Sequence, residues 1–149
     1  MSLSSTLLFG SSSLKKEDEW TLLESVQNHF FPQNRYPSAS NFEALRYLKI
    51  VSKHDSFGEK NLQFLKKGAK EIQKLGFKTN LASSQKEKIL QEFAKSNFGN
   101  KWISMILTYT IEALFSDPIY GGNKDFIGSK SFEHNSGFPR PKNRFGKSS

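Results

Sequence analysis

The sequence predicts an all-α fold: a bundle of about five helices followed by a long irregular C-terminal tail. Before residue 117, apolar residues recur at steps of three and four, which is the period of an α-helix. The connections are short, and no segment alternates apolar and polar residues as a strand would. The chain therefore divides into a leading segment, 1–13, a helical bundle, 14–116, and a Gly/Pro-rich turn with an extended tail, 117–149.

The first helix is expected to begin near Ser13 or Leu14 and to end at Phe30. Three acidic residues, 17–19, would lie in its first turns, where the positive end of the helix dipole favours them. Its apolar stripe follows helical spacing: Trp20, Leu23, Val26 and Phe30. Pro32 then ends the helix, because proline cannot continue the hydrogen-bond ladder.

The second and third helices have sequence signals at their ends. Ser40 and Glu43 have the spacing of a capping box, which predicts that the second helix starts at Ser40 and fades over 54–56. The third helix is expected over Gly58–Leu75, with a glycine directly after it. Gly68 inside this helix is intrinsically unfavourable, so we expect it to mark close packing against another helix.

The fourth and fifth helices follow after a short polar connection. Ser84 and Glu87 repeat the capping-box spacing, so the fourth helix is expected to start there and to end before Phe98. The fifth is expected over Lys101–Phe115 and is apolar nearly all round. A helix that is apolar on every side is usually surrounded by other helices. This segment is therefore the predicted centre of the bundle.

The segment Asp117–Phe126 separates the helical part from the tail. Pro118 disfavours helical geometry at the residue before it and has no amide hydrogen. Gly121 and Gly122 permit backbone angles closed to other residues, and Asn123 tolerates left-handed geometry. We predict a shaped turn in which the two glycines hold special backbone angles and the Asp and Asn side chains cap neighbouring backbone groups.

The tail is basic and rich in Gly and Pro, which forbid long regular elements. Its aromatic residues recur every six or seven positions: Phe126, Phe132, Phe138 and Phe145. Ordering about 25 residues costs about 1–2 kcal/mol each in backbone entropy. Burying four Phe side chains returns only about 1.5–3 kcal/mol each. The sequence therefore predicts that the tail becomes ordered on the surface of another protein.

Composition excludes several kinds of site. The chain has no Cys, so it holds no disulfide, thiolate metal site or cysteine-ligated cluster. Its three His residues are isolated and match no zinc-binding spacing: His29, His54 and His134. Asp117, Asn123 and Asp125 could surround a calcium ion, but they lack the alternating spacing of an EF-hand. We predict a non-enzyme with no catalytic residue, cofactor or metal site of its own.

The formal net charge of +8 raises the question of nucleic-acid binding. Most Lys residues in the helical segments stand beside Glu, which is typical of a solvated face rather than a phosphate-binding track. No nucleic-acid partner is therefore expected. The longest charge-poor run, Trp102–Ile111, is too short to span a bilayer.

The first residues run from apolar to small without a basic start. They fit two interpretations: the end of an export signal whose charged start is missing, or a disordered Ser-rich terminus. The sequence leaves both open.

The segment Phe115–Gly128 resembles the Asp-Pro-x-Tyr-Gly-Gly-Asn-x-x-x-x-Gly motif of the gluconate 2-dehydrogenase subunit 3 family. Looser similarity covers most of the chain, at Phe31-Pro32, Leu81–Gln85 and Gly137–Pro141. The chain departs from the family in two places. It has no twin arginine, and Gly128-Ser129-Lys130 stands where the family usually has Gly-Trp-Lys, so one expected aromatic contact is missing.

The resemblance implies a small, non-catalytic accessory subunit of a bacterial FAD-dependent sugar or sugar-acid dehydrogenase. In that family the large subunit holds FAD, and a cytochrome c subunit commonly passes electrons to the membrane. The small subunit typically carries a twin-arginine leader and is thought to carry the folded catalytic subunit across the inner membrane. The implied location is the periplasm, with membrane association through the partner subunits.

The predicted partner-binding residues lie in the turn and tail. They are Asp117, Pro118, Tyr120, Gly121, Gly122, Asn123, Asp125, Phe126, Gly128, Phe132, Phe138 and Arg140. Tyr120 is expected to be an aromatic anchor on the partner. A purely structural turn after the central helix is the other interpretation, and the two are compatible. The alternative function is a stand-alone helical binding module whose basic tail meets an acidic protein or a nucleic acid.

Overall fold

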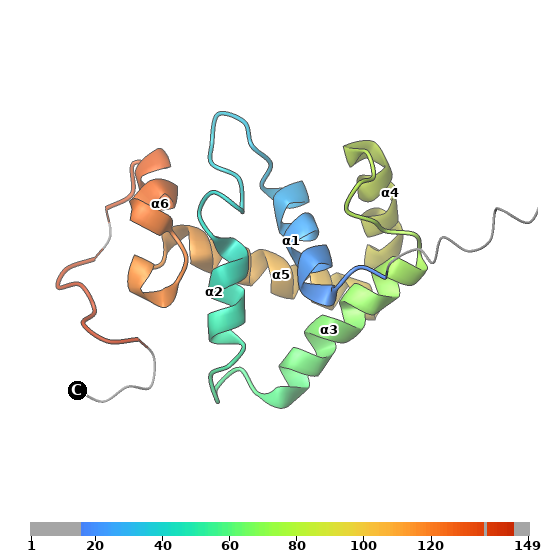
Figure 1. Ribbon diagram of the computed structural model, residues 1–149, viewed down its shortest axis with the longest axis horizontal. Helices are drawn as coiled ribbons and strands as arrows, with labels where there is room; N and C mark the ends of the chain where they lie inside the picture. The colour runs from blue at the N-terminus through green and yellow to red at the C-terminus, as the bar shows by residue number, and fades with distance from the viewer. Residues whose placement is uncertain (1–15, 136, 145–149) are drawn as a thin grey trace, which may run out of the picture.

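Helix α5 (Asn97–Phe115) extends across the molecule, with α6 at one end and α3 and α4 at the other (Figure 1). The structure is a computed structural model that describes residues 16–135 and 137–144. The other α-helices are α1 (Glu19–Phe30), α2 (Ala44–Val51), α3 (Glu59–Lys74), α4 (Ser83–Ala94) and α6 (Ile127–Ser131). Two short 3-10 helices, η2 (Pro118–Tyr120) and η3 (Lys124–Phe126), lie between α5 and α6. The described residues contain no β-strand, which confirms the predicted all-α class.

The central position predicted for the fifth helix is confirmed. Helix α5 contacts α1, α2, α3, α4 and α6. Its fully buried Trp102 and Ile106 join the main core, together with apolar side chains from α1 to α4. A smaller second cluster surrounds Ala113 and Leu114, close to the turn that follows α5. The C-terminal half of α5 therefore connects the main core to the candidate site.

Gly68 lets α3 and α5 pack at short range, as its place inside a helix predicted. A Cβ atom at this position would lie 2.1 Å from the indole of Trp102. The indole Nε1–H of Trp102 donates to the carbonyl oxygen of Leu65 at 2.8 Å, which satisfies its polar atom inside the core. The glycine is therefore needed for space rather than for its backbone angles.

The first helix begins later than predicted. Residues 16–18 are not helical, and the expected start at Ser13 or Leu14 lies outside the described residues. Asp18 is the N-cap, because its Oδ2 accepts from the amide of Thr21 at 3.2 Å. Glu17 instead accepts from the amide and hydroxyl of Thr79, between α3 and α4. Two of the three acidic residues thus cap or bridge rather than lie within the helix.

The predicted capping box at Ser40 and Glu43 is wrong. Helix α2 begins at Ala44, and Glu43 precedes it with a φ of 56° and no side-chain cap. Ser38 and Asn41 form the reciprocal side-chain contacts two residues upstream, where the Asn41 Oδ1 accepts from the Ser38 amide at 2.9 Å. Two serines therefore precede a polar side chain by three positions: Ser38 with Asn41, and Ser40 with Glu43. In the turn over 38–43, only the first pair forms the reciprocal contacts.

The boundary between the fourth and fifth helices also differs from the prediction. Helix α4 starts at Ser83, and the Gln85 side chain accepts from the amide of Ala82, so the predicted box of Ser84 and Glu87 does not form. Helix α5 starts at Asn97, four residues before the predicted Lys101, because Ser96 caps it. Gly99 lies inside its first turn, where a Cβ would meet the backbone of α4's Phe93 at 1.9 Å.

Candidate partner-binding surface

The turn after α5 starts with a capped 3-10 helix. The Asp117 Oδ1 accepts from the amide of Ile119 at 3.0 Å, and Pro118 occupies the first position of η2. Gly121 ends η2 with a φ of 98°, in the left-handed region that favours glycine. It is buried, and a Cβ there would lie 2.4 Å from the side chain of Ile50 on α2. The predicted special angle is confirmed for this glycine.

Gly122 serves a different purpose from the one predicted. Its φ is not positive, so the expectation of a special backbone angle is wrong at this position. A Cβ on Gly122 would lie 2.7 Å from the carbonyl oxygen of Ala113. The residue therefore allows the turn to lie directly against the backbone of α5.

Asn123 ties the turn together from inside. It is fully buried and has a φ of 46°. Its Nδ2 donates to the carbonyl oxygen of Ser116 at 2.8 Å and to the hydroxyl of Ser129 at 3.1 Å. Its Oδ1 accepts from the amides of Gly128 at 2.9 Å and Ser129 at 3.1 Å. One amide side chain thus joins the end of α5 to the start of α6, which confirms the predicted capping roles of Asn123 and Asp117.

Gly128 completes this arrangement on α6. A Cβ there would lie 2.3 Å from the carbonyl oxygen of Leu114 and 3.0 Å from the Asn123 Oδ1. The absence of a side chain at Gly128 therefore lets the buried side-chain amide of Asn123 reach the backbone of α6. Tyr120 is half-buried and packs against the second cluster. The packing of the bundle continues through this segment to Ser131.

Arg140 brings the tail back onto the turn. Its Nε donates to the Asp117 Oδ2 at 2.8 Å, and its Nη2 donates to the Oδ1 at 3.1 Å. The hydrogen bond from Arg140, helped by the Ile119 amide, holds the pKa of the Asp117 carboxyl below its usual value. Further along, the Arg144 Nε donates to the carbonyl oxygen of Ile119 at 2.8 Å. These two arginines fix where the tail crosses η2.

A shallow hollow of ≈ 220 Å³ lies beside this crossing. We call it the tail surface, and it is lined by Phe126, Ser129, Lys130, His134, Asn135, Phe138 and Arg140. The guanidinium of Arg140 lies 4.8 Å from the ring centroid of Phe126, a cation–π distance. The Phe138 side chain is 85% exposed. An aromatic side chain this exposed, in a hollow that Lys130 and Arg140 also line, gives the surface an apolar contact point with a basic rim.

Next to the tail surface, Phe132 at the end of α6 is 44% exposed. Its ring stacks on Tyr36 with centroids 4.6 Å apart, and it meets the edge of Phe115 at 5.7 Å. Tyr36 comes from the connection between α1 and α2, which no sequence pattern linked to the tail. The exposed aromatic area therefore draws on two distant parts of the chain.

The twelve predicted residues separate into three groups by burial. Gly121, Gly122, Asn123 and Gly128 are buried and shape the turn. Four more are half-buried: Asp117, Pro118, Tyr120 and Phe126. Asp125, Phe132, Phe138 and Arg140 are exposed. Direct contact with a partner stays a prediction, and it is open to the last group without rearrangement. Phe145 lies outside the described residues.

Several residues of the surface were not among those predicted. Lys130 and Arg144 belong to the basic tail, and their positive charge was a usable signal. His134 lies edge-on to Phe115 at 5.4 Å, a contact that requires the folded turn. Two of the three side chains that could surround a calcium ion already accept hydrogen bonds: Asp117 accepts from Arg140 and Ile119, and Asn123 accepts from two amides. Among the residues that the structure describes, no helix is long and apolar enough to cross a bilayer.

A family model described as gluconate 2-dehydrogenase subunit 3 matches residues 17–134, which is most of the chain. The chain belongs to the gluconate 2-dehydrogenase subunit 3 family. Comparisons with curated proteins and with solved structures each found no match. The family match covers the bundle, the turn and α6, and it ends at His134. Phe138 and Arg140 lie beyond it, so their part in the surface is argued from the geometry of this chain.

Membership places the chain among subunits of a dehydrogenase complex, which confirms the predicted family. The family's name implies association with the other subunits of a gluconate 2-dehydrogenase.

Proposed function

We propose that this chain is a non-catalytic accessory subunit that docks onto the large flavoprotein subunit of an FAD-dependent sugar or sugar-acid dehydrogenase. Family membership supports an accessory role in such a complex. The exposed Phe138 beside Arg140 supports docking through the tail surface. Aromatic and arginine side chains dominate the binding energy of many protein interfaces.

The single observation that carries the docking proposal is the exposure of Phe138. An 85% exposed phenylalanine leaves most of its apolar surface in water. Burial of such a side chain contributes about 1.5–3 kcal/mol, and this gain is realised only when another surface covers it. The hollow beside it, with Lys130 and Arg140 at its edge, offers a rim suited to an acidic or hydrogen-bonding partner.

The proposal assigns the chemistry to other subunits. The large subunit binds FAD and oxidises the substrate, and a cytochrome c subunit receives the electrons. The complex works in the periplasm and is held at the membrane through these partners. The proposed contribution of this chain is assembly and export of the folded catalytic subunit rather than catalysis.

Co-expression of this chain with a large FAD-binding oxidoreductase encoded by an adjacent gene tests the proposal. An affinity tag on this chain should retrieve the large subunit with its flavin, seen as the yellow absorbance of FAD. Removal of this chain should leave the large subunit unassembled or unexported. A large subunit that folds, is exported and stays active without this chain would overturn the proposal.

The same preparation tests the stand-alone alternative. Binding of the purified chain to nucleic acid or to an acidic protein, with an affinity that falls steeply as salt is raised, would favour a free binding module. Absence of the large subunit from the retrieved material would point in the same direction.

A further inference from the structure

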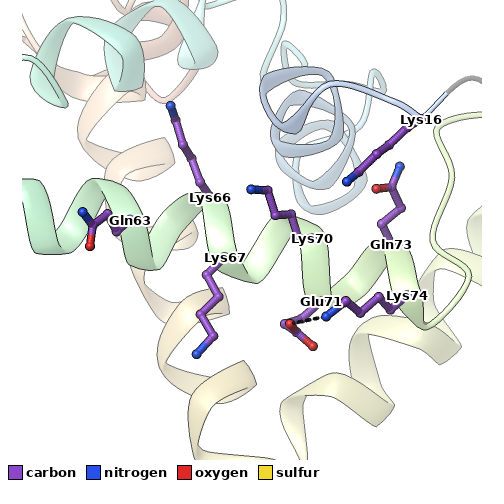
Figure 2. A pocket seen from close by; sticks show the side chains of 8 residues that line it. All are labelled: Lys16, Gln63, Lys66, Lys67, Lys70, Glu71, Gln73 and Lys74. Atoms are coloured by element: carbon purple, nitrogen blue, oxygen red, sulfur yellow. Dashed lines mark hydrogen bonds and ion pairs between the residues drawn. The ribbon is translucent and has the colours of Figure 1, made fainter.

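A lysine-lined groove follows the exposed face of α3. The C-terminal part of α3 lies at one end of the molecule, and α6 lies at the opposite end (Figure 1). The groove is open and has a volume of ≈ 600 Å³. The described residues that line it are five lysines, two glutamines and one glutamate: Lys16, Lys66, Lys67, Lys70, Lys74, Gln63, Gln73 and Glu71. Figure 2 shows the lysines fanning out from α3, with Lys16 approaching from the segment before α1. We call this feature the lysine groove.

The lysines occupy the helix face opposite the core. Leu65, Ala69 and Ile72 are fully buried under α3. Lys66, Lys70 and Lys74 follow at steps of four on the other side. Like charges at this spacing repel each other and lower the stability of a helix. The stability of α3 alone therefore does not explain why these three positions all carry lysine.

Nearby acids neutralise only part of the positive charge. Lys74 pairs with Glu71 at 2.9 Å, and Lys70 pairs with Glu19 at 3.4 Å. Within 16–135 and 137–144, the other three lysines of the groove form no ion pair. The charge also continues onto α2, because the ammonium groups of Lys66 and Lys49 lie 6.0 and 5.6 Å from the ring of Trp20. A positive potential therefore extends over this end of the molecule.

We propose that the lysine groove binds the headgroups of anionic phospholipids, so that this face of the chain lies on a negatively charged membrane surface. Each lysine held near such a surface adds to the electrostatic attraction. Leu75 is the C-cap of α3, directly after Lys74 of the groove, and its apolar side chain is 48% exposed. An apolar side chain beside a cluster of lysines is the combination found on proteins that lie on membrane surfaces.

The residue types in the groove favour lipid over other polyanions. The described residues of the lining include lysine and no arginine. Lysine is a flexible point charge, which suits mobile and interchangeable headgroups, whereas arginine provides the fixed fork that reads a carboxylate or phosphate in one geometry. Among the residues that the structure describes, the lining also contains no aromatic side chain on which a nucleic-acid base could stack. Contact with the membrane here would leave the tail surface, at the other end of α5, free for a protein partner.

Sedimentation of the purified full chain with lipid vesicles tests the proposal. Vesicles of phosphatidylcholine alone are compared with an equal mixture of phosphatidylcholine and phosphatidylglycerol. The chain should bind the mixed vesicles and not the neutral ones. Raising sodium chloride from about 0.1 M to about 1 M shortens the Debye length from about 10 Å to about 3 Å, so it should release the chain.

Charge-matched variants locate the site. Lys66→Gln, Lys67→Gln and Lys70→Gln together should lower the vesicle partition coefficient about 100-fold. The control combines Lys88→Gln, Lys95→Gln and Lys101→Gln, which remove the same charge from exposed positions outside the groove. It should lower the coefficient by no more than about threefold, because attraction falls off within a Debye length of the membrane surface. Lys67→Gln alone, at an exposed position, repeats the test if the triple variant does not fold.

Four results would overturn the proposal. Equal binding to neutral and anionic vesicles, or binding to neither, would exclude anionic headgroups. An equal loss in both triple variants would assign the binding to net charge rather than to the groove. Tighter groove-dependent binding to DNA than to anionic vesicles would assign the groove to a different anion. None of these results depends on the dehydrogenase partner, so the docking proposal stands or falls separately.

Discussion

Arg140 and Asp117 are 23 residues apart in the sequence, and they form a two-point ion pair that returns the tail to the turn after α5. The Asp117 side chain is only 7% exposed, whereas Arg140 is 49% exposed. Asp117 also caps η2 through the amide of Ile119. The Asp117 carboxylate therefore caps the turn and also holds Arg140, a residue of the tail surface, against it.

Replacement Arg140→Gln should release the tail without unfolding the bundle. The guanidinium is exposed and contacts the turn, so its loss removes the link between tail and η2 but leaves the core intact. We expect faster cleavage by protease in the segment 137–144 and an unchanged melting temperature. Lys142→Gln, at an exposed position nearby, is the matched control. Cleavage at the wild-type rate in the Arg140 variant would show that the ion pair does not hold the tail.

The packing of the tail against the turn should depend on pH only under acidic conditions. The pKa of Asp117 is lowered from its usual 3.8, first by the hydrogen bond from Arg140. A carboxyl whose pKa is lower in the packed state stabilises that state above pH 3.8 and loses this contribution as the pH falls through the lowered value. Protease sensitivity of the tail should therefore stay constant from neutral pH to about pH 4 and rise below it. In Asp117→Asn this rise should disappear.

Asn123→Ala should destabilise the turn more than any exposed substitution in it. The variant leaves the amides of Gly128 and Ser129 and the carbonyl of Ser116 without their partner. Buried groups left unpaired cost about 1–3 kcal/mol each, partly offset by relaxation, so we expect the free energy of unfolding to fall by about 2–4 kcal/mol. Chemical denaturation measures this change. Ser129→Ala removes only the hydroxyl that accepts from the Asn123 Nδ2 and should lose less; an equal loss would contradict the central role of the Asn123 side chain.

Gly68→Ala should destabilise the bundle although alanine is the better helix former. Its Cβ would lie 2.1 Å from the Trp102 indole, so α3 and α5 must move apart. Overpacking costs about 1–3 kcal/mol, which we expect to exceed the roughly 1 kcal/mol gained in helix propensity. Gly137→Ala, which has nothing within 4 Å of the new Cβ, is the control. A more stable Gly68→Ala variant by urea denaturation would show that the two helices separate at little cost.

Much of the fold could be predicted from the sequence because periodicity is a property of whole segments. The apolar stripes predicted the helices α1 to α5. The central position of α5 was predicted because this helix is apolar on nearly every side. The ends of helices were less predictable. A capping box needs only two residues at the right spacing, and Ser40 with Glu43 satisfied it without forming one. The fifth helix was expected to start at Lys101, but Gly99 already lies in the first turn of α5, where a Cβ would meet the backbone of Phe93.

The candidate site could be predicted in part. The capping roles of Asp117 and Asn123 and the left-handed angle of Gly121 follow from residue type. The role of Gly122 did not, because its need for glycine comes from the Ala113 carbonyl on another element. Tyr36 shows the same limit: its stacking on Phe132 joins positions that only the folded chain brings together.

The affinity of the purified chain for the purified large flavoprotein subunit tests the central claim most directly. Isothermal titration calorimetry compares the wild type with Phe138→Ala, and Leu75→Ala, an exposed apolar side chain at the other end of the molecule, is the control. Phe138 is almost fully exposed, so its replacement should change the free energy of unfolding by less than about 0.5 kcal/mol. We predict that Phe138→Ala weakens binding by about tenfold or more while Leu75→Ala leaves it unchanged. Equal affinity in all three proteins would contradict docking through the tail surface.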